Sequence, residues 1–155
     1  MRGPRELAAQ PRSSRGKTRA YLGLGSNIGT RARNLSAARR RLRQRGVRIL
    51  RQSRVMETEP WGVTDQPRFL NQVLEVEWQG SPQQLLTVAK AVEREGGRTP
   101  ALRWGPRVID VDILLFGAER VSEPDLQIPH PRIAERPFVT AGLDELGAGG
   151  NRPGP

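Results

Sequence analysis

Two aspartates, Asp110 and Asp112, lie two positions apart within the apolar run 108–116. Side chains alternate across a β-strand, so both carboxylates point to one face, about 6.6 Å apart along the strand. Carboxylates at this spacing can share one or two cations, and oxygen ligands of this kind suit magnesium. The alternative is an ordinary edge strand with two solvent-facing acids. The arginines and the tryptophan just upstream favour the metal site.

Three arginines, Arg98, Arg103 and Arg107, precede these aspartates in a polar loop. Guanidinium groups bind phosphate through paired hydrogen bonds, so this loop can hold a polyphosphate. A solvated basic loop is the alternative, and the adjacent aspartates weaken it. The glycines between residues 23 and 29 match neither a dinucleotide-binding fingerprint nor a P-loop. Phosphate binding is therefore assigned to the arginines and a metal.

The only histidine, His130, lies between Pro129 and Pro131, and Arg136 follows it. The two prolines fix the backbone on both sides and therefore the direction of the ring. A structural or merely exposed histidine is the alternative, because a lone loop histidine more often has no chemical role.

Three aromatic residues, Phe69, Trp104 and Phe138, each stand beside polar loop residues. They can stack on a flat ligand, and Asn71 offers a donor and an acceptor to the edge of an amide-like ring. Ordinary core packing is the alternative for each aromatic taken separately. Together these groups predict a small soluble enzyme that uses magnesium-bound ATP to modify a flat heterocycle.

The composition limits the class of protein. A chain of 155 residues fits one domain, and the absence of cysteine excludes disulfides and thiolate metal sites. Residues 1–54 hold sixteen of the 26 Lys and Arg residues and one acid, Glu6, so the basic half suggests nucleic acid. The acidic half holds most of the chemistry above. No apolar run is long enough to span a bilayer or to form a secretory signal, so we expect a cytoplasmic protein without membrane contact.

The pattern of apolar residues and turns predicts the element order β-α-β-β-α-β, with Asn34 as cap of the first helix and Ser81 as cap of the second. The elements are expected at residues 20–25, 34–45, 47–57, 69–78, 82–95 and 108–116, followed by an amphipathic stretch at 138–146. This is the order of a ferredoxin-like α+β sandwich, with an antiparallel sheet, both helices on one face and the other face free for a ligand. Residues 1–18 and 147–155 are predicted to be disordered tails that flank a single domain at 19–146.

The fifteen residues 103–117 closely resemble the signature of the 6-hydroxymethyl-7,8-dihydropterin pyrophosphokinase family. The resemblance covers roughly residues 20–146. Other landmarks match in the same order: Gly25-Ser26-Asn27, Asp65-Gln66-Pro67, Phe69-Leu70-Asn71, Glu93, Gly97-Arg98, Pro129-His130-Pro131, Arg136 and Phe138.

The resemblance implies transfer of pyrophosphate from ATP to the hydroxymethyl group of the pterin, with release of AMP, in folate biosynthesis. Asp110 and Asp112 would hold two magnesium ions, and Arg98 and Arg107 would stabilise the transferring phosphates. The nucleotide site would comprise Glu93, Arg98, Arg103, Trp104, Arg107, Ile113, His130 and Arg136. The pterin site would comprise Thr58, Pro60, Trp61, Phe69, Asn71, Trp104 and Phe138, with the two phenylalanines on either side of the ring.

The chain departs from the family pattern at two positions. Lys90 stands where glutamine is usual beside the nucleotide, and Pro100 stands where a second arginine often follows Arg98. The rival hypothesis is an RNA-binding module of the same topology, because the chain is basic. Tyr21 is the only aromatic residue in the first strand, and an acidic pair on a strand would repel RNA. We therefore expect a monomer that acts on small molecules, with no obligate nucleic acid.

Overall fold

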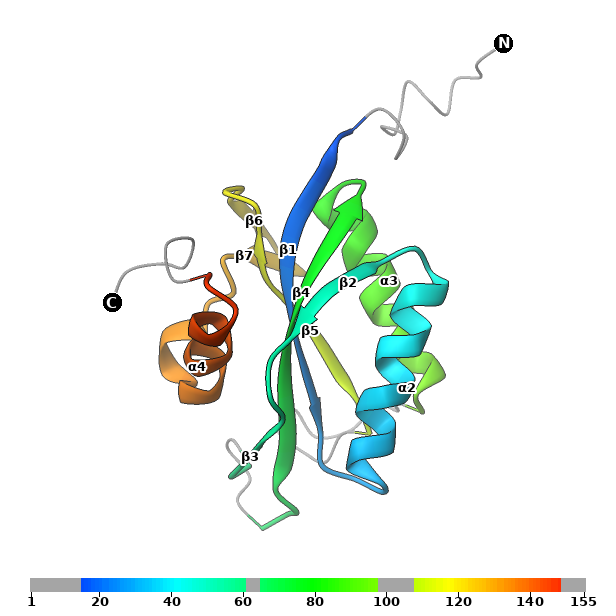
Figure 1. The fold of residues 1–155 in the computed structure, drawn as a ribbon, viewed down its shortest axis with the longest axis vertical. Helices are drawn as coiled ribbons and strands as arrows, with labels where there is room; N and C mark the ends of the chain where they lie inside the picture. The colour runs from blue at the N-terminus through cyan, green and yellow to red at the C-terminus, as the bar shows by residue number, and fades with distance from the viewer. Residues whose placement is uncertain (1–14, 61–64, 98–107, 149–155) are drawn as a thin grey trace.

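The computed structural model describes residues 15–60, 65–97 and 108–148, which form a mixed α/β fold around an antiparallel sheet (Figure 1). The strands of this sheet run in the order β2-β4-β1-β5, and β3 pairs with β4. The elements are β1 (Lys17–Ser26), α2 (Arg31–Gln44), β2 (Arg48–Gln52), β3 (Met56–Thr58), β4 (Phe69–Gln79), α3 (Pro82–Glu95), β5 (Asp110–Phe116), β6 (Val121–Glu123), β7 (Leu126–Ile128), η2 (Ile133–Glu135) and α4 (Pro137–Glu145). The predicted combination of helices and an antiparallel sheet is confirmed.

Two apolar clusters hold the layers together. Helices α2 and α3 cover one face of the sheet, and their apolar stripes pack on residues such as Leu22 and Val76. Helix α4 lies on the other face, where its Val139 and Leu143 pack with Tyr21 and Val73 (Figure 1). The expectation that this second face is free is therefore wrong in part, because the apolar side of the C-terminal helix needs a surface on which to be buried.

The ends of the two long helices differ in how well the sequence predicts them. Ser81 caps α3 as predicted: its hydroxyl accepts a hydrogen bond from the N–H of Gln84, whose side chain accepts one from the N–H of Ser81. Asn34 is not the cap of α2, which begins at Arg31. The Asn34 amide instead donates to the hydroxyl of Ser26 and to the carbonyl of Ile28, so it fixes the preceding loop from inside the helix.

Several boundaries differ from the predicted ones. The expected strand 47–57 is divided into β2 and β3, and between them the buried Ser53 hydroxyl accepts a hydrogen bond from the N–H of Val73. The hairpin of β6 and β7 was not predicted. Strand β1 begins at Lys17, inside the predicted tail 1–18, and Ala148 is buried inside the predicted tail 147–155. No helix within the described ranges is long and apolar enough to cross a membrane.

Gly142 allows α4 to approach β4 closely, and Gly142→Ala is expected to lower the free energy of unfolding by about 1–3 kcal/mol. A Cβ atom at this position would lie 2.4 Å from Cγ2 and 2.8 Å from Cβ of Val73, a β-branched residue that is itself buried. Urea denaturation measures the change. Gly16→Ala is the matched control, because a Cβ atom at Gly16 would meet nothing within 4 Å. Equal stabilities of the two variants would show that α4 shifts without cost.

Candidate active site

The acidic pair lies on the same side of the sheet as α4. Asp110 and Asp112 are partly exposed on β5, whereas Val111 and Ile113 are buried in the core beneath α2 and α3. The prediction that the two carboxylates share one face is confirmed by this alternation. Among the residues the structure describes, no group of three or more His, Cys, Asp or Glu side chains could hold a metal. A bound cation would therefore need oxygen ligands beyond this pair, which fits magnesium bound together with phosphate.

Two glycines of β1 face the aspartates across the sheet. Gly25 pairs with Asp110 on one side and with Asn71 on the other, and Gly23 pairs with Asp112 and Val73. A Cβ atom at Gly25 would lie 3.0 Å from Oδ1 of Asn71 and 3.5 Å from the ring of Phe69. The missing side chain therefore lets Asn71 and Phe69 lie over β1, and no side chain of β1 separates them from Asp110.

Asn71, Phe69 and Thr58 form one wall beside this strip of glycine backbone, which we call the amide wall. Asn71 is only 5% exposed, and its amide nitrogen donates to the hydroxyl of Thr58. Thr58 pairs with Phe69 through the short strand β3. Pro60, two residues after Thr58 in the sequence, is buried. Phe138 is half-buried on the first turn of α4. Three of the predicted pterin residues are thus brought together.

A second cluster joins the acidic pair to the loop that follows β7. Nη1 of Arg136 lies 3.7 Å from Oδ2 of Asp112, and the Arg136 side chain is 18% exposed. The N–H of His130 donates to the carbonyl of Leu114 at 2.9 Å, which fixes this loop to β5. The predicted nucleotide residues His130 and Arg136 therefore lie beside one of the predicted metal ligands.

The surroundings of His130 favour the neutral form of its imidazole. Burial lowers its pKa most, the charge of Asp112 opposes this shift, and the charges of Arg136 and Arg132 reinforce it. Its Nδ1 accepts a hydrogen bond from the N–H of Arg132 at 3.2 Å, so we assign the ring proton to Nε2. A neutral ring with Nε2–H can donate one hydrogen bond to a phosphate or base without adding charge.

Glu93 and Ile113 lie on the helix side of β5, away from the two aspartates. Glu93 is 2% exposed, its Oε2 accepts a hydrogen bond from the N–H of Val111 at 2.8 Å, and Lys90 Nζ lies 3.7 Å from its Oε1. Glu93 thus holds the backbone of β5 between the two aspartates. The side chain of Ile113 belongs to the core, so any contact it makes with a nucleotide must come from its backbone.

The other predicted residues, Trp61, Arg98, Arg103, Trp104 and Arg107, lie outside the described residues. The sequence excludes a phosphate-binding fingerprint at Gly23 and Gly25, but it does not show that they leave one face of β1 without side chains beside Asp110 and Asp112. The spacing of two between the glycines was the available signal, because it removes side chains from one face of an otherwise apolar strand.

Comparisons with known proteins identify relatives of this chain. A family model described as 7,8-dihydro-6-hydroxymethylpterin-pyrophosphokinase matches residues 21–148. The 2-amino-4-hydroxy-6-hydroxymethyldihydropteridine pyrophosphokinase of Bacillus subtilis is 44% identical over 128 residues, which is 82% of this chain and 77% of that protein. The mitochondrial folate synthesis bifunctional protein of Pisum sativum is 45% identical over 125 residues, 81% of this chain.

The chain covers only 24% of the length of this pea protein, about a quarter. Among solved structures, one of Plasmodium falciparum HPPK-DHPS has a TM-score of 0.63 and 16% sequence identity. The match covers 81% of this chain and 41% of that chain. At this identity the likeness shows the fold alone.

Proposed function

Because this chain belongs to the 7,8-dihydro-6-hydroxymethylpterin-pyrophosphokinase family, we propose that it transfers pyrophosphate from ATP to the hydroxymethyl group of 6-hydroxymethyl-7,8-dihydropterin, releasing AMP. The reaction would serve folate biosynthesis. The observation that carries the proposal is the strip of glycine backbone between the amide wall and the acidic pair. A flat acceptor and a metal-bound polyphosphate can meet across this strip.

The amide wall suits a pterin. The heterocycle presents an edge of alternating hydrogen-bond donors and acceptors, which a buried amide such as Asn71 can match. The ring of Phe69 offers a stacking surface beside it, and Phe138 would cover the opposite side of the pterin. A ligand that lacks this polar edge could not add hydrogen bonds to those that Asn71 already makes, so the wall favours a ring with a polar edge.

The acidic pair suits the phosphate end. Asp110 and Asp112 would hold two magnesium ions, which neutralise charge on phosphate oxygens when they are bound. Arg136 and His130 would contact the nucleotide, and Arg98 and Arg107 are proposed to bind the transferring phosphates. The hydroxymethyl oxygen would give up its proton to solvent and form a bond to the β-phosphorus, while the bond from that phosphorus to the α,β-bridging oxygen breaks and AMP leaves. The chain contributes mainly position and charge to such a step.

The strand order β2-β4-β1-β5, with α2 and α3 on one face, supports assignment of the sheet to the ferredoxin-like topology. An RNA-binding module of this topology stacks bases on the open face of its sheet. Here that face carries Asp110 and Asp112 and is partly covered by α4, which favours the enzyme. A cytoplasmic, monomeric state remains a prediction.

The direct test is to supply ATP, magnesium and 6-hydroxymethyl-7,8-dihydropterin to the purified protein and to follow the products. We expect AMP and the pyrophosphorylated pterin in equal amounts, and no AMP when either magnesium or the pterin is omitted. Release of ADP, or of AMP without the pterin, would contradict the proposal.

Asn71→Ala is expected to weaken dihydropterin binding by about 10- to 100-fold, because the polar edge of the pterin loses its hydrogen-bonding partner. ATP affinity should change by less than about twofold, because Asn71 does not contact the nucleotide in the proposed site. Titration calorimetry with each ligand separately measures both values. Gln79→Ala is the matched control, since it removes an amide from the far end of the same strand. An equal loss for both ligands would count against a separate pterin site.

A further inference from the structure

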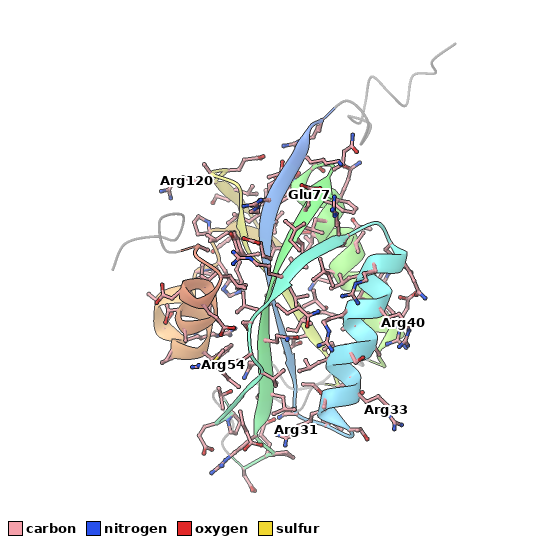
Figure 2. The ribbon with its side chains drawn as sticks, in the orientation of Figure 1. Arg31, Arg33, Arg40, Arg54, Glu77 and Arg120 are labelled. Atoms are coloured by element: carbon pink, nitrogen blue, oxygen red, sulfur yellow. The ribbon has the colours of Figure 1, made fainter. Side chains whose placement is uncertain are left out.

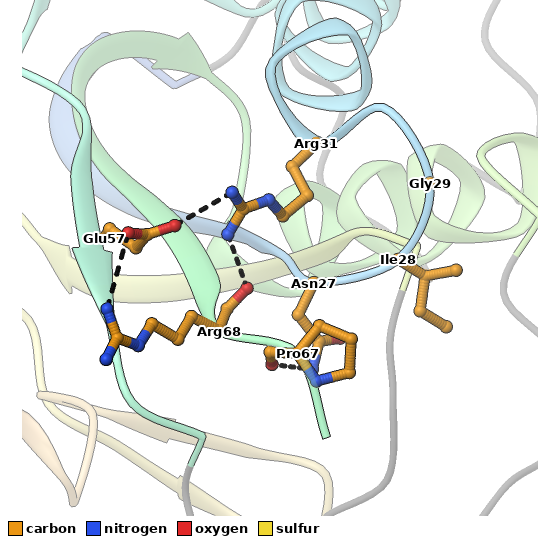
Figure 3. A pocket seen from close by; sticks show the side chains of 7 residues that line it. All are labelled: Asn27, Ile28, Gly29, Arg31, Glu57, Pro67 and Arg68. Atoms are coloured by element: carbon orange, nitrogen blue, oxygen red, sulfur yellow. Dashed lines mark hydrogen bonds and ion pairs between the residues drawn. The ribbon is translucent and has the colours of Figure 1, made fainter.

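Arg31, the first residue of α2, joins the two strands of the amide wall from the face of the sheet that α2 covers (Figure 3). Its Nη2 lies 2.8 Å from Oε2 of Glu57, and its Nη1 donates to the carbonyl of Arg68 at 2.7 Å. Glu57 immediately precedes Thr58, and Arg68 immediately precedes Phe69. One guanidinium group thus contacts both chain segments one residue away from the wall.

This connection matters because β3 is short. It has three residues and pairs with β4 only from Met56 to Thr58. A three-residue edge strand has few hydrogen bonds with which to hold its position. The planar guanidinium fork fixes two partners at once, so it sets the distance between Glu57 and Arg68 more tightly than a single contact would. Arg68 extends the link, with its Nη1 3.9 Å from Glu57 and its Nε 3.0 Å from Glu59.

The helix end that carries Arg31 is itself fixed. The Asn34 amide donates to the carbonyl of Ile28 at 2.8 Å, within the loop that leads into α2. Asn27, which is 1% exposed, donates from its amide to Oε1 of Gln66 and to the carbonyl of Pro67. Figure 3 shows the hydrogen bond of Asn27 to Pro67 in the same pocket as the contacts of Arg31 with Glu57 and Arg68. Hydrogen bonds therefore join the loop before α2 to the segment before β4.

We propose that Arg31 and Glu57 are positioning residues that hold Thr58 and Phe69 in place for the flat acceptor, an inference that rests on the proposed function. The ion pair is partly exposed, at 29% and 45% of the two side chains, so it adds little to stability. The pair has a larger effect on the site, because a displacement of about 1 Å can lower kcat/KM by up to about 100-fold. Loss of the pair should therefore appear in substrate binding and not in folding.

The test compares Arg31→Ala, Arg31→Lys and Glu57→Gln with Arg33→Ala, which removes an exposed arginine two residues further along α2 (Figure 2). We expect Arg31→Ala to raise KM for the dihydropterin by about 10-fold, with kcat and KM for ATP changed by less than about twofold. Arg31→Lys should restore part of the loss, because an ammonium can pair with Glu57 but lacks the fork. Arg33→Ala should match the wild type.

A double variant, Arg31→Ala with Glu57→Gln, should be little worse than Arg31→Ala alone, because both changes break the Arg31–Glu57 pair and the remaining contact of Glu57 with Arg68 is long, at 3.9 Å. Equal KM values for Arg31→Ala and Arg33→Ala, or equal increases for both substrates, would overturn the positioning role. If Arg31→Ala does not fold, Glu57→Gln decides by the same comparison.

Hydrogen exchange separates this inference from the proposed function. Amides at 56–58 and 69–71 should exchange faster in Arg31→Ala than in Arg33→Ala, whatever the substrate is. A wild-type protein that releases no AMP would refute the proposed function, and the exchange data would still decide the link. Unchanged exchange in Arg31→Ala would overturn the link even if the wild type is active.

Discussion

Replacing Asp110 or Asp112 with alanine is expected to lower turnover by at least about 1000-fold while the fold survives. Both side chains are partly exposed, and the glycines opposite them make no side-chain packing that could be lost. Their removal would leave phosphate charge without its cation, and each 1.4 kcal/mol of lost transition-state stabilisation costs about tenfold in rate. The effect should therefore fall on the reaction and not on stability.

The measurement is AMP release at saturating ATP, dihydropterin and magnesium, together with thermal unfolding of each variant. Asp125→Ala is the matched control, because Asp125 is an exposed aspartate in the turn between β6 and β7. We expect it to retain wild-type turnover. Near-normal turnover of either Asp110→Ala or Asp112→Ala would refute the assignment of the acidic pair as metal ligands.

Glu75→Gln is expected to lower the free energy of unfolding by about 2–4 kcal/mol, since it removes a buried charge with three charge-assisted hydrogen bonds. Glu75 is 3% exposed, accepts from the hydroxyl of Tyr21 at 2.6 Å, and accepts from Nε and Nη2 of Arg51 at 2.9 and 3.2 Å. Arg51 also donates to the carbonyl of Leu146, so the cluster ties the end of α4 to the sheet. A melting temperature lower by roughly 4–16 °C would follow for a chain of this size.

The same cluster makes stability depend on pH in acid. The hydrogen bond from Arg51 lowers the pKa of Glu75 most, and Tyr21 adds to this shift against the effect of burial. A carboxylate with a lowered folded pKa stabilises the fold at pH values above its unfolded pKa of about 4.3, and this contribution is lost as pH falls through the folded pKa. Glu75→Gln should therefore show a flatter loss of stability below about pH 4.3 than the wild type.

Glu77→Gln is the control for both measurements. Glu77 lies on the same strand, its side chain is 26% exposed, and its ion pairs with Lys17 and Arg48 are longer, at 3.8 and 3.6 Å. We expect a change of less than about 1 kcal/mol, as for other surface pairs. Equal destabilisation by both variants would show that burial of Glu75 adds nothing.

The sequence predicted most of the sheet and both long helices, because their signals are local. Alternation placed Asp110 and Asp112 on one face of β5, and Ser81 with Pro82 marked the start of α3. Glu75 lies on the face of β4 opposite Leu74 and Val76, and no local pattern shows that α4 covers this face. Burial of a given face depends on which distant element packs there, and no local pattern records this.

The sequence identified residues of the candidate site better than it identified their arrangement in space. Asn71 and Phe69 were chosen as ligands for a flat ring, yet their approach to Asp110 depends on Gly25, which becomes visible only when β1 is paired on both sides. Glu93 was expected beside the nucleotide, and this contact stays a prediction. What the sequence did not show is that its carboxylate accepts a hydrogen bond from the N–H of Val111 on the buried face of β5. Both arrangements depend on strand register, which decides which residues lie opposite each other and cannot be read from the sequence alone.

The position of β1 between β4 and β5 has a consequence for synthesis in the cell. The ribosome releases the chain N-terminus first, so β1 and β4 are available to pair well before β5 emerges. Until then one edge of β1, with its apolar run of residues 20–25, has no neighbour and can pair with another nascent chain. The strand that brings Asp110 and Asp112 into the site is thus also the strand that closes this edge of β1.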